Sequence, residues 1–537
     1  YAQRRVGFNN TLPSDGNGGA LFWNARGTEE TKCTIDGCKF LYNKSDDNGG
    51  AIKSQGTMEF VGGQTEIAYN TAPVGAGLYI EGYTGGSTVS GERTINYSLN
   101  DKMYIHDNNA PYYDYDGSFY PGKGAGVHLF FGDQMTLEMG STINLQLSGA
   151  RIENNISQGY GDEYPSQGGG IYFENTSLSS KGYKFNISLN YGSVLTNKAS
   201  NGAGVYVYKG EVGSENINNN TLNISNNISS LNGGGIYIEE GSLAMANGSI
   251  NNNNITGSGH GGGIYIENGD FTIEAGQLVG NSVSSGMGAG VYIVGSGTLG
   301  NFTMKGGEIK NNTASNNNGG GVYVNGGNFT LYQGAITGNI SSGDGGGVYV
   351  NGGNFILNHS MGSISTNKAV NGGGVFLNNG NFDLVVGKIT GNITSGLGGG
   401  VYLKGDDCIY QLKKGQIEDN EANNGGGVYL ENGSFILAPD QGDNGSILGN
   451  IASSKGGGVY IADGGDFTMR GGTVAGTSTQ VGNGGGIFLD GGSFYQTSGK
   501  INGNVAKTNG GGVCIMNNGN FTMSNAETRQ NGRLQAG

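Results

Sequence analysis

The 537-residue chain is poor in charge, in proline and in long apolar runs. Charged residues make up 13% of it and the formal net charge is −14, so it would repel the phosphate backbone of a nucleic acid. Only 6 residues are proline against 111 glycines, and glycine does not recur at every third position, which excludes collagen. The chain contains no run of about eighteen apolar residues, which is the length that a helix needs to span a membrane. Hydrophobic residues still account for 35% of the chain, including 29 Tyr and 20 Phe, which is enough to build a packed core.

Cysteine is scarce as well, with four residues in the chain. Cys33 and Cys38 lie close together in Cys33-Thr-Ile-Asp-Gly-Cys38, so we expect a local disulfide between them. Cys408 and Cys514 lie four units apart in the repeat described below, about 19 Å at roughly 4.8 Å per unit, which is too far for a disulfide. We expect both to be free thiols, with Cys514 inside a strand.

A repeated unit is the strongest pattern in the sequence. It is clearest from Gly319 to Asn339, where Gly-Gly-Gly-Val-Tyr-Val is followed by Gly-Gly-Asn-Phe-Thr-Leu and by Gly-Ala-Ile-Thr-Gly-Asn. Equivalent glycine-rich anchors have a regular spacing of 26 to 31 residues and begin at positions 18, 49, 75, 124, 168, 202, 233, 261, 288, 319, 345, 372, 398, 425, 456, 484 and 510. Repeats of this length are typical of solenoids.

Each unit contains three short β-prone stretches separated by glycine and asparagine. In the unit from Gly319 they are residues 322–324, residues 329–331 and the stretch around Ile336. Because side chains alternate along a strand, the first and third residues of residues 322–324 and of residues 329–331 should face the interior, as should Ile336. Tyr323 should face outward. Because no stretch has the 3.6-residue period of a helix, each strand must pair with its counterpart in the next unit.

The sequence therefore predicts an all-β, right-handed parallel β-helix of about seventeen rungs, with three strands in each rung and three parallel sheets. At roughly 4.8 Å per rung, the rod would be about 80 Å long. We expect one continuous solenoid, with irregular rungs over residues 1–167 and regular Gly-Gly-Gly rungs over residues 168–537.

Two polar or aromatic series accompany the repeat. Asparagines recur at the third turn, where stacked amides would form a hydrogen-bonded ladder; they are Asn254, Asn281, Asn312, Asn339, Asn367, Asn392, Asn420, Asn450 and Asn504. Aromatic residues recur in the first strand and predict an outward stripe, which either stabilises the sheet as a ladder or offers a face for sugar stacking or for another contact. They are Tyr172, Tyr206, Tyr237, Tyr265, Tyr292, Tyr323, Tyr349, Phe376, Tyr402, Tyr429, Tyr460 and Phe488.

The N-terminal units resemble the repeats of the polymorphic outer-membrane proteins, which pair Phe-x-x-Asn with Gly-Gly-Ala-Ile/Leu/Val. Phe40-Leu-Tyr-Asn43 followed by Gly49-Gly-Ala-Ile52 matches both elements, and Gly18-Gly-Ala-Leu21 matches the second. From Gly168 onward the anchors become Gly-Gly-Gly or Gly-Ala-Gly. The resemblance implies a surface-exposed, adhesin-like β-helix of the pectin-lyase-like superfamily.

Enzymes that act on polysaccharides share this predicted fold, and two of their catalytic motifs have partial counterparts in this chain. Polygalacturonases combine an Asp-Asp pair with Gly-His-Gly and Arg-x-Lys, and this chain has Gly259-His260-Gly261 and Asp406-Asp407. The two elements lie five rungs apart, about 24 Å, whereas the catalytic groups of a glycosidase lie within about 10 Å of each other. We expect no catalytic residue, metal or cofactor, although activity on acidic glycans would favour an enzyme.

The repeat is interrupted by two insertions, each placed just before an anchor. They are residues 109–121 and residues 158–165, and they occupy the same turn of successive rungs. Departures from a strict repeat are common places for function, so we expect the two loops to project together as one contact surface. The alternative is a pair of loops that packs on itself. The candidate contact residues are Tyr112, Tyr113, Asp114, Tyr115, Asp116, Tyr120, Tyr160, Asp162 and Tyr164.

Twenty Asn-x-Ser/Thr sequons occur, as expected by chance in a chain so rich in these residues. In Asn328-Phe-Thr330 the phenylalanine should face inward and the asparagine outward, where a glycan can be attached. Asn339 and Asn392 also lie in sequons, but they belong to the predicted ladder and should be harder to modify. The glycosylation candidates are Asn9, Asn43, Asn96, Asn155, Asn301, Asn328 and Asn520.

Three functions fit these patterns. A parallel β-helix exposes unpaired strands at its ends, and neither end of this sequence has an amphipathic helical cap. The leading hypothesis is therefore a non-enzymatic, glycosylated, extracellular or cell-surface protein that associates end to end in a filament or stalk. The second is a monomeric adhesin that uses the Tyr/Asp loops, with carbohydrate as a partner. The third, a polysaccharide lyase or hydrolase, has the least support.

Overall fold

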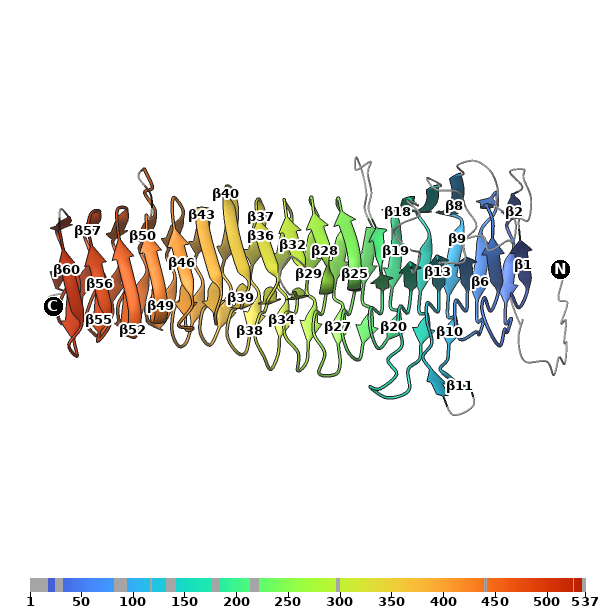
Figure 1. Cartoon of the computed structure of the whole chain (residues 1–537), viewed down its shortest axis with the longest axis horizontal. Coiled ribbons are helices and arrows are strands. Elements are labelled where there is room, and N and C mark those ends of the chain that lie inside the picture. The colour runs from blue at the N-terminus through green and yellow to red at the C-terminus, as the bar shows by residue number, and fades with distance from the viewer. Residues whose placement is uncertain are drawn as a thin grey trace.

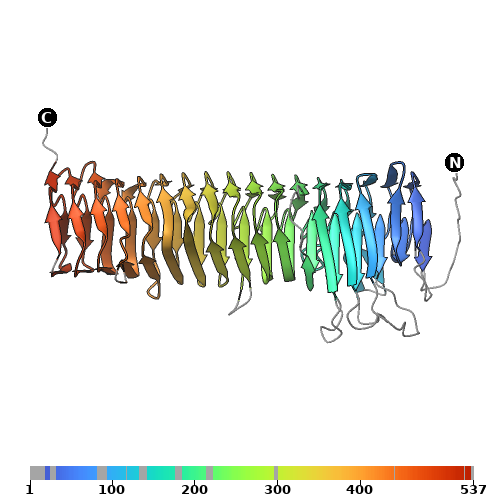
Figure 2. The same ribbon diagram turned by 90° about the horizontal axis from the view of Figure 1, so that it is seen from above.

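The computed structural model describes residues 18–24, 32–81, 94–115, 118–131, 142–175, 184–212, 222–295, 300–438, 440, 442–524 and 526–533. These residues form strands and turns without a helix, and they wind into one long rod (Figure 1; Figure 2). Strand β1 (Leu21–Asn24) lies at one end, and β60 (Asn520–Met523) lies near the other. The predicted parallel β-helix is confirmed.

One rung contains four strands rather than the three predicted. In the unit from Gly319 these are β35 (Val322–Asn325), β36 (Asn328–Leu331), β37 (Gly334–Thr337) and β38 (Ile340–Ser341). Strand β38 was not predicted because two residues are too few to show an alternating pattern. Each strand pairs in parallel with its counterpart one rung on, as in the register of Val322 with Val348.

The strands form four rows along the rod, one row for each strand of the rung. The first row pairs without interruption from β1 to β59 (Val513–Met516), and the fourth row has 15 strands, from β10 (Asn109–Ala110) to β62 (Gly532–Arg533). The structure thus has about 15 full turns, slightly fewer than the seventeen rungs predicted, because the first two rungs reach the fourth row only through isolated bridges. In places two rows join in one long strand, such as β25 (Ile236–Met245), β40 (Asn354–Ser365) and β52 (Val459–Met469).

The N-terminal rungs differ from the others in their second row. There, β2 (Cys33–Asp36), β5 (Met58–Val61), β8 (Thr94–Asn100), β14 (Thr142–Ser148) and β18 (Lys184–Asn190) form a separate 5-stranded sheet. The first row nevertheless continues across the predicted boundary at residues 167 and 168, since β13 (Val127–Phe131) pairs with β17 (Ile171–Asn175).

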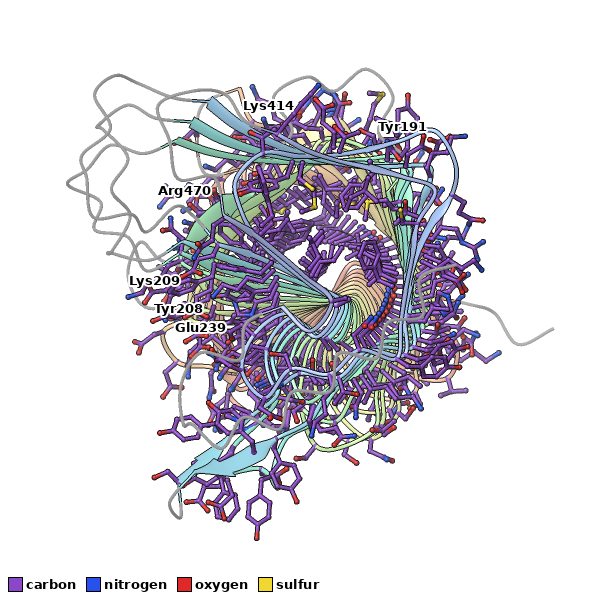
Figure 3. The ribbon with its side chains drawn as sticks, turned by 90° about the vertical axis from the view of Figure 1, so that its right-hand side faces the viewer. Tyr191, Tyr208, Lys209, Glu239, Lys414 and Arg470 are labelled. Carbon is purple, nitrogen blue, oxygen red and sulfur yellow. The ribbon has the colours of Figure 1, made fainter. Side chains whose placement is uncertain are left out.

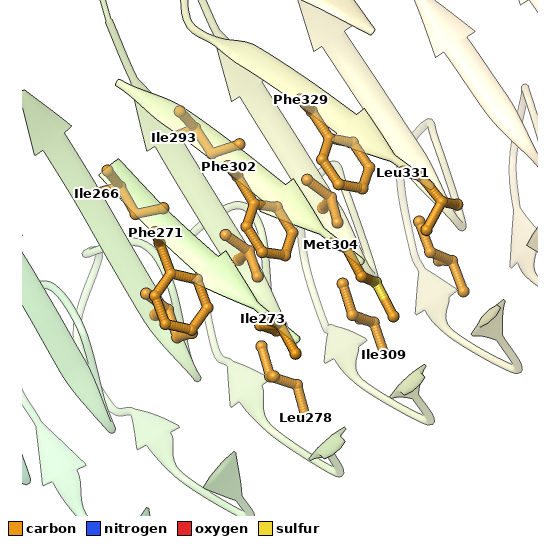
Figure 4. Packing of buried hydrophobic residues seen from close by; sticks show 14 of the residues in the cluster. Ile266, Phe271, Ile273, Leu278, Ile293, Phe302, Met304, Ile309, Phe329 and Leu331 are labelled. Carbon is orange, nitrogen blue, oxygen red and sulfur yellow. The ribbon is translucent and has the colours of Figure 1, made fainter. Parts of the chain in front are cut away.

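The core consists of like side chains stacked along the rod. Phe302 lies between Phe271 and Phe329, with ring centroids 5.5 and 4.8 Å apart (Figure 4). The predicted inward residues of the unit from Gly319 have no exposed surface, including Val322 and Ile336. Burying each such side chain contributes about 1.5–3 kcal/mol.

An asparagine ladder runs along the turn before the fourth row. The side-chain amide of Asn339 donates to Asn367 Oδ1 at 2.9 Å and to the Ile309 carbonyl at 2.9 Å, and its backbone N–H donates to the same Asn367 oxygen. Asn339 Oδ1 in turn accepts two bonds from Asn312. Every polar group of this fully buried amide is therefore paired.

The ladder is longer than predicted and includes one correction. Asn254 is not a member, because it lies one residue further on, in β27 (Asn254–Ile255), and Asn253 takes the ladder position. The other eight predicted members are confirmed. The full series is Asn43, Asn70, Asn108, Asn155, Asn197, Asn227, Asn253, Asn281, Asn312, Asn339, Asn367, Asn392, Asn420, Asn450, Thr477, Asn504 and Asn531.

The glycine anchors make room for this ladder. Gly319 has a φ of 72°, which a residue with a side chain rarely adopts. A Cβ atom on Gly321 would lie 2.5 Å from the Gly347 carbonyl oxygen and 3.1 Å from Asn339 Nδ2. The third anchor position therefore stays glycine in this rung because a ladder amide and the next rung occupy the space.

The aromatic stripe lies on the outward face of the first row, as predicted, but it is buried. Tyr323 is only 5% exposed, and its ring stacks on that of Tyr349 with a centroid distance of 4.7 Å. Side chains from neighbouring turns, including Met287 and Leu397, pack against the stripe. The predicted role in stabilising the sheet is supported, whereas a solvent-facing stripe for sugar stacking is wrong.

Thr477 interrupts the ladder and provides a test of it. Its hydroxyl lies 2.8 Å from Asn504 Oδ1 and 2.6 Å from the Gly485 carbonyl, and one hydroxyl hydrogen cannot serve both acceptors. On the other side, Asn450 donates to the Ile417 carbonyl, but within the described residues no hydrogen bond joins it to Thr477.

We expect Thr477→Asn to raise stability by about 1 kcal/mol, because it supplies the missing amide acceptor, and Asn339→Ala to lower it by about 3 kcal/mol, because buried groups lose their partners. Thermal unfolding of the two variants beside the parent chain measures both effects. Equal melting temperatures for Asn339→Ala and the parent would contradict a stabilising ladder.

The buried tyrosines predict a loss of stability at alkaline pH. Burial raises the pKa of Tyr349 and of Tyr429 to about 12, and it raises the pKa of Tyr323 as well. The unfolded chain ionises its tyrosines near pH 10, while the folded chain keeps them neutral, so stability is unaffected below about pH 10 and falls above it.

Denaturant midpoints measured from pH 8 to pH 11.5 should show this fall. Tyr349→Phe should reduce its slope, since Phe376 already fills the next position of the stripe. A midpoint that stays constant over this range would show that the tyrosines ionise equally in the folded and unfolded chains.

Candidate functional site

The first insertion forms a hairpin that leaves the rod. Strands β11 (Tyr113–Tyr115) and β12 (Ser118–Tyr120) pair in antiparallel fashion, with Tyr113 opposite Tyr120, whereas the rows of the rod are parallel. The hairpin projects sideways, both in Figure 1 and in the view along the rod axis in Figure 3. It is therefore a separate structure attached to the solenoid.

The second insertion packs against this hairpin. Tyr160 and Tyr164 form an antiparallel bridge, and the Gln158 N–H donates to the Ala110 carbonyl at 2.8 Å. The Phe119 ring stacks on that of Tyr160, with a centroid distance of 4.2 Å and an interplanar angle of 1°. The two loops thus come together as predicted, and we call their described residues outside the fourth row the protrusion (residues 111–115, 118–121 and 158–165).

Much of the aromatic surface of the protrusion is exposed. The exposed fractions are 41% for Tyr112, 37% for Tyr113, 43% for Tyr120 and 45% for Tyr160. Tyr164 is half-buried, because its ring lies beside that of Phe119. The loops therefore pack on themselves and at the same time present tyrosines to solvent.

The charge of the protrusion is entirely negative. Asp114, Asp162 and Glu163 are exposed, and neither insertion contains a lysine or arginine. Burial, together with the nearby carboxylate of Asp47, raises the pKa of the Tyr113 hydroxyl. Of the other predicted contact residues, Asp116 and the side chain of Tyr115 lie outside the described residues.

Phe119 was missing from the predicted contact set. It contacts three tyrosines and anchors one insertion to the other. The signal was its position between Ser118 and Tyr120, since alternation in a strand places it on the face opposite Tyr120.

The residues considered for hydrolase chemistry remain apart. His260 stacks on Tyr292 with a centroid distance of 4.5 Å, and its Nδ1 accepts a hydrogen bond from the Met287 N–H. Asp406 and Asp407 lie five anchors further along, where they line an open hollow with Asp466. Among the described residues, no group of three His, Cys, Asp or Glu side chains is placed to hold a metal ion.

The predicted disulfide between Cys33 and Cys38 is wrong. Cys33 begins β2, pairs with Met58 of β5 and packs against the core, whereas Cys38 is exposed and its thiol lies 3.3 Å from the Asp36 carbonyl. The Cys33 side chain therefore faces the core of the rod, whereas the Cys38 side chain faces solvent. Cys408 and Cys514 are free and buried, and Cys514 lies in β59, as predicted.

The glycosylation candidates fall into different environments. Asn155 is a fully buried ladder residue, so its selection was wrong, and Asn43 also takes part in the ladder. Asn301 and Asn328 are half-buried and Asn520 is exposed, all on the outward face of the second row. Asn9 and the side chain of Asn96 lie outside the described residues.

Two further rows of asparagine amides, which the sequence reasoning missed, lie on the outer surface. In one, Asn328 donates to Asn301 at 2.9 Å and Asn354 donates to Asn328 at 2.9 Å. In the other, Asn351 donates to Asn325 at 3.0 Å and Asn378 donates to Asn351 at 2.9 Å. The recurrent Asn-Gly-Gly-Asn-Phe segment could have predicted both rows, because its two asparagines occupy one row each.

No helix in the described part of the chain is long and apolar enough to cross a membrane.

Comparisons with known proteins assign the chain to no family. The chain matches no protein-family model, and it matches no curated protein and no solved structure to a significant degree.

Proposed function

We propose that the protein is a non-enzymatic structural rod of an extracellular filament or surface stalk. The observation that carries this proposal is the length of the asparagine ladder, because the amide of one rung bonds to that of the next from Asn43 to Asn450, and the series resumes from Thr477 to Asn531. A solenoid stabilised mainly by contacts between neighbouring rungs can be extended by further rungs that repeat the same contacts.

The last described rung leaves apolar side chains exposed. Ile515 is 46% exposed, whereas Leu489, its counterpart one rung earlier, has no exposed surface. Met523 is likewise 41% exposed. A further rung of similar cross-section, from a longer chain or from a second copy, would cover these apolar side chains and pair with the free strand edges.

A second candidate function, an adhesin-type binding module, is favoured by the protrusion. Binding residues often lie on loops that project from a regular scaffold, and tyrosine is enriched at protein contact surfaces. This function needs no contact between rod ends, so it can be tested separately.

Electron microscopy of the purified full chain over a range of concentrations tests the rod proposal. Fibres that lengthen with concentration, with rungs continuous along the axis, are expected. Single rods at every concentration would contradict the filament and leave the binding module as the better candidate.

The proposal includes N-linked glycans on the outward asparagines. After expression through a eukaryotic secretory pathway, we expect glycans at Asn301, Asn328 and Asn520 and none at Asn155, whose buried amide is held by the ladder. Mass spectrometry of peptides before and after glycosidase treatment measures this. A mass unchanged by the glycosidase would refute the glycosylated rod.

A further inference from the structure

We propose that the protrusion binds a basic, arginine-containing segment of a partner protein. This inference rests on the second candidate function, the binding module, and specifies the chemistry of its partner. It does not depend on whether the rods form filaments.

The first argument is charge. The two insertions contain no lysine or arginine, and Asp114, Asp162 and Glu163 lie in described, exposed positions. A surface with charge of one sign favours a partner with the opposite sign and steers its approach. A second copy of the same protrusion would be repelled, because a symmetric contact would place like charges opposite one another.

The second argument is the arrangement of the rings. Tyr113 stacks on Tyr120 with a centroid distance of 5.0 Å, and Phe119 stacks on Tyr160 at 4.2 Å, so the rings support one another in fixed positions. Rigid tyrosines lose little conformational entropy on binding. A guanidinium group can stack on an aromatic face while its N–H groups bond to a carboxylate, and this protrusion offers both partners.

The third argument is the difference between the protrusion and the rest of the rod. In the aromatic stripe of the first row, tyrosines such as Tyr323 are covered, and acidic groups such as Glu267 accept hydrogen bonds from tyrosines of the stripe. In the protrusion, by contrast, tyrosines and carboxylates are both exposed. Tyr112 and Tyr160, together with Asp162 and Glu163, are thus available there to a ligand.

Fluorescence anisotropy with labelled hexa-arginine and hexa-lysine peptides tests the proposal on the full chain at low and moderate salt. The hexa-arginine peptide should bind more tightly. The double variant Tyr112→Ser, Tyr160→Ser should weaken it by about 3-fold per ring and abolish the preference for arginine over lysine. The double variant Asp162→Asn, Glu163→Gln should weaken both peptides equally and reduce the salt dependence.

Matched controls separate this site from general attraction to an acidic protein. Asp406→Asn with Asp407→Asn removes the same charge from the hollow on the rod, and Tyr495→Ser removes a tyrosine that is 39% exposed on the rod. These variants should bind like the parent. Equal weakening by the controls, or retention of the arginine preference after loss of both tyrosines, would overturn the proposal.

Two other ligands provide further outcomes that would overturn it. Binding of a neutral chito-oligosaccharide, but of neither peptide, would assign the protrusion to carbohydrate. Dimerisation that is lost on deletion of residues 110–121 would assign it to a second copy of the chain. Because all these variants leave the rod ends unchanged, electron microscopy of the same samples distinguishes failure of this inference from failure of the filament.

Discussion

The hydrogen bonds of the asparagine ladder hold successive rungs in register, and much of the fold depends on them. A buried ladder amide bonds to the amide one rung on, as Asn339 does to Asn367, because an unpaired buried amide is costly, and Asn450 before Thr477 is the exception. The residue before the ladder therefore adopts a left-handed conformation in many rungs, as Asn311 does with a φ of 54°. The close spacing of rungs also favours glycine at the anchors, since a Cβ atom on Gly321 would collide with the Gly347 carbonyl oxygen of the next rung and crowd the amide of Asn339.

Stacking of like side chains on both faces of the wall extends this order to the rest of the cross-section. The phenylalanine stack fills the interior, while the aromatic stripe of the first row is covered by residues of the neighbouring turns. In the regular rungs, most of the aromatic surface is therefore buried within the rod. The protrusion is different, because its stacked rings remain partly exposed among carboxylates. We therefore propose a structural role for the regular rungs and a binding role for the protrusion.

The repeat made the fold predictable, whereas single positions were harder to place. Alternation identified the interior positions of Val322 and Phe329, and the two insertions predicted loops that meet. In Asn252-Asn253-Asn254, however, a shift of one residue exchanges a ladder amide for a strand residue, and composition cannot distinguish them. The outward face of Tyr323 was predicted, but its burial depends on turns from other rungs. Proximity along the chain suggested a Cys33–Cys38 disulfide, which the opposite orientations of the two thiols exclude.

Native-state amide hydrogen exchange tests the central role of the ladder most directly. The backbone N–H groups of Asn312, Asn339 and Asn367 donate to ladder oxygens and should be among the slowest to exchange in the chain. The N–H of Asn450, next to Thr477, should exchange faster than these. Ladder amides that exchange as fast as exposed turn amides, with no difference at Asn450, would contradict the ladder as the interaction on which the rod depends.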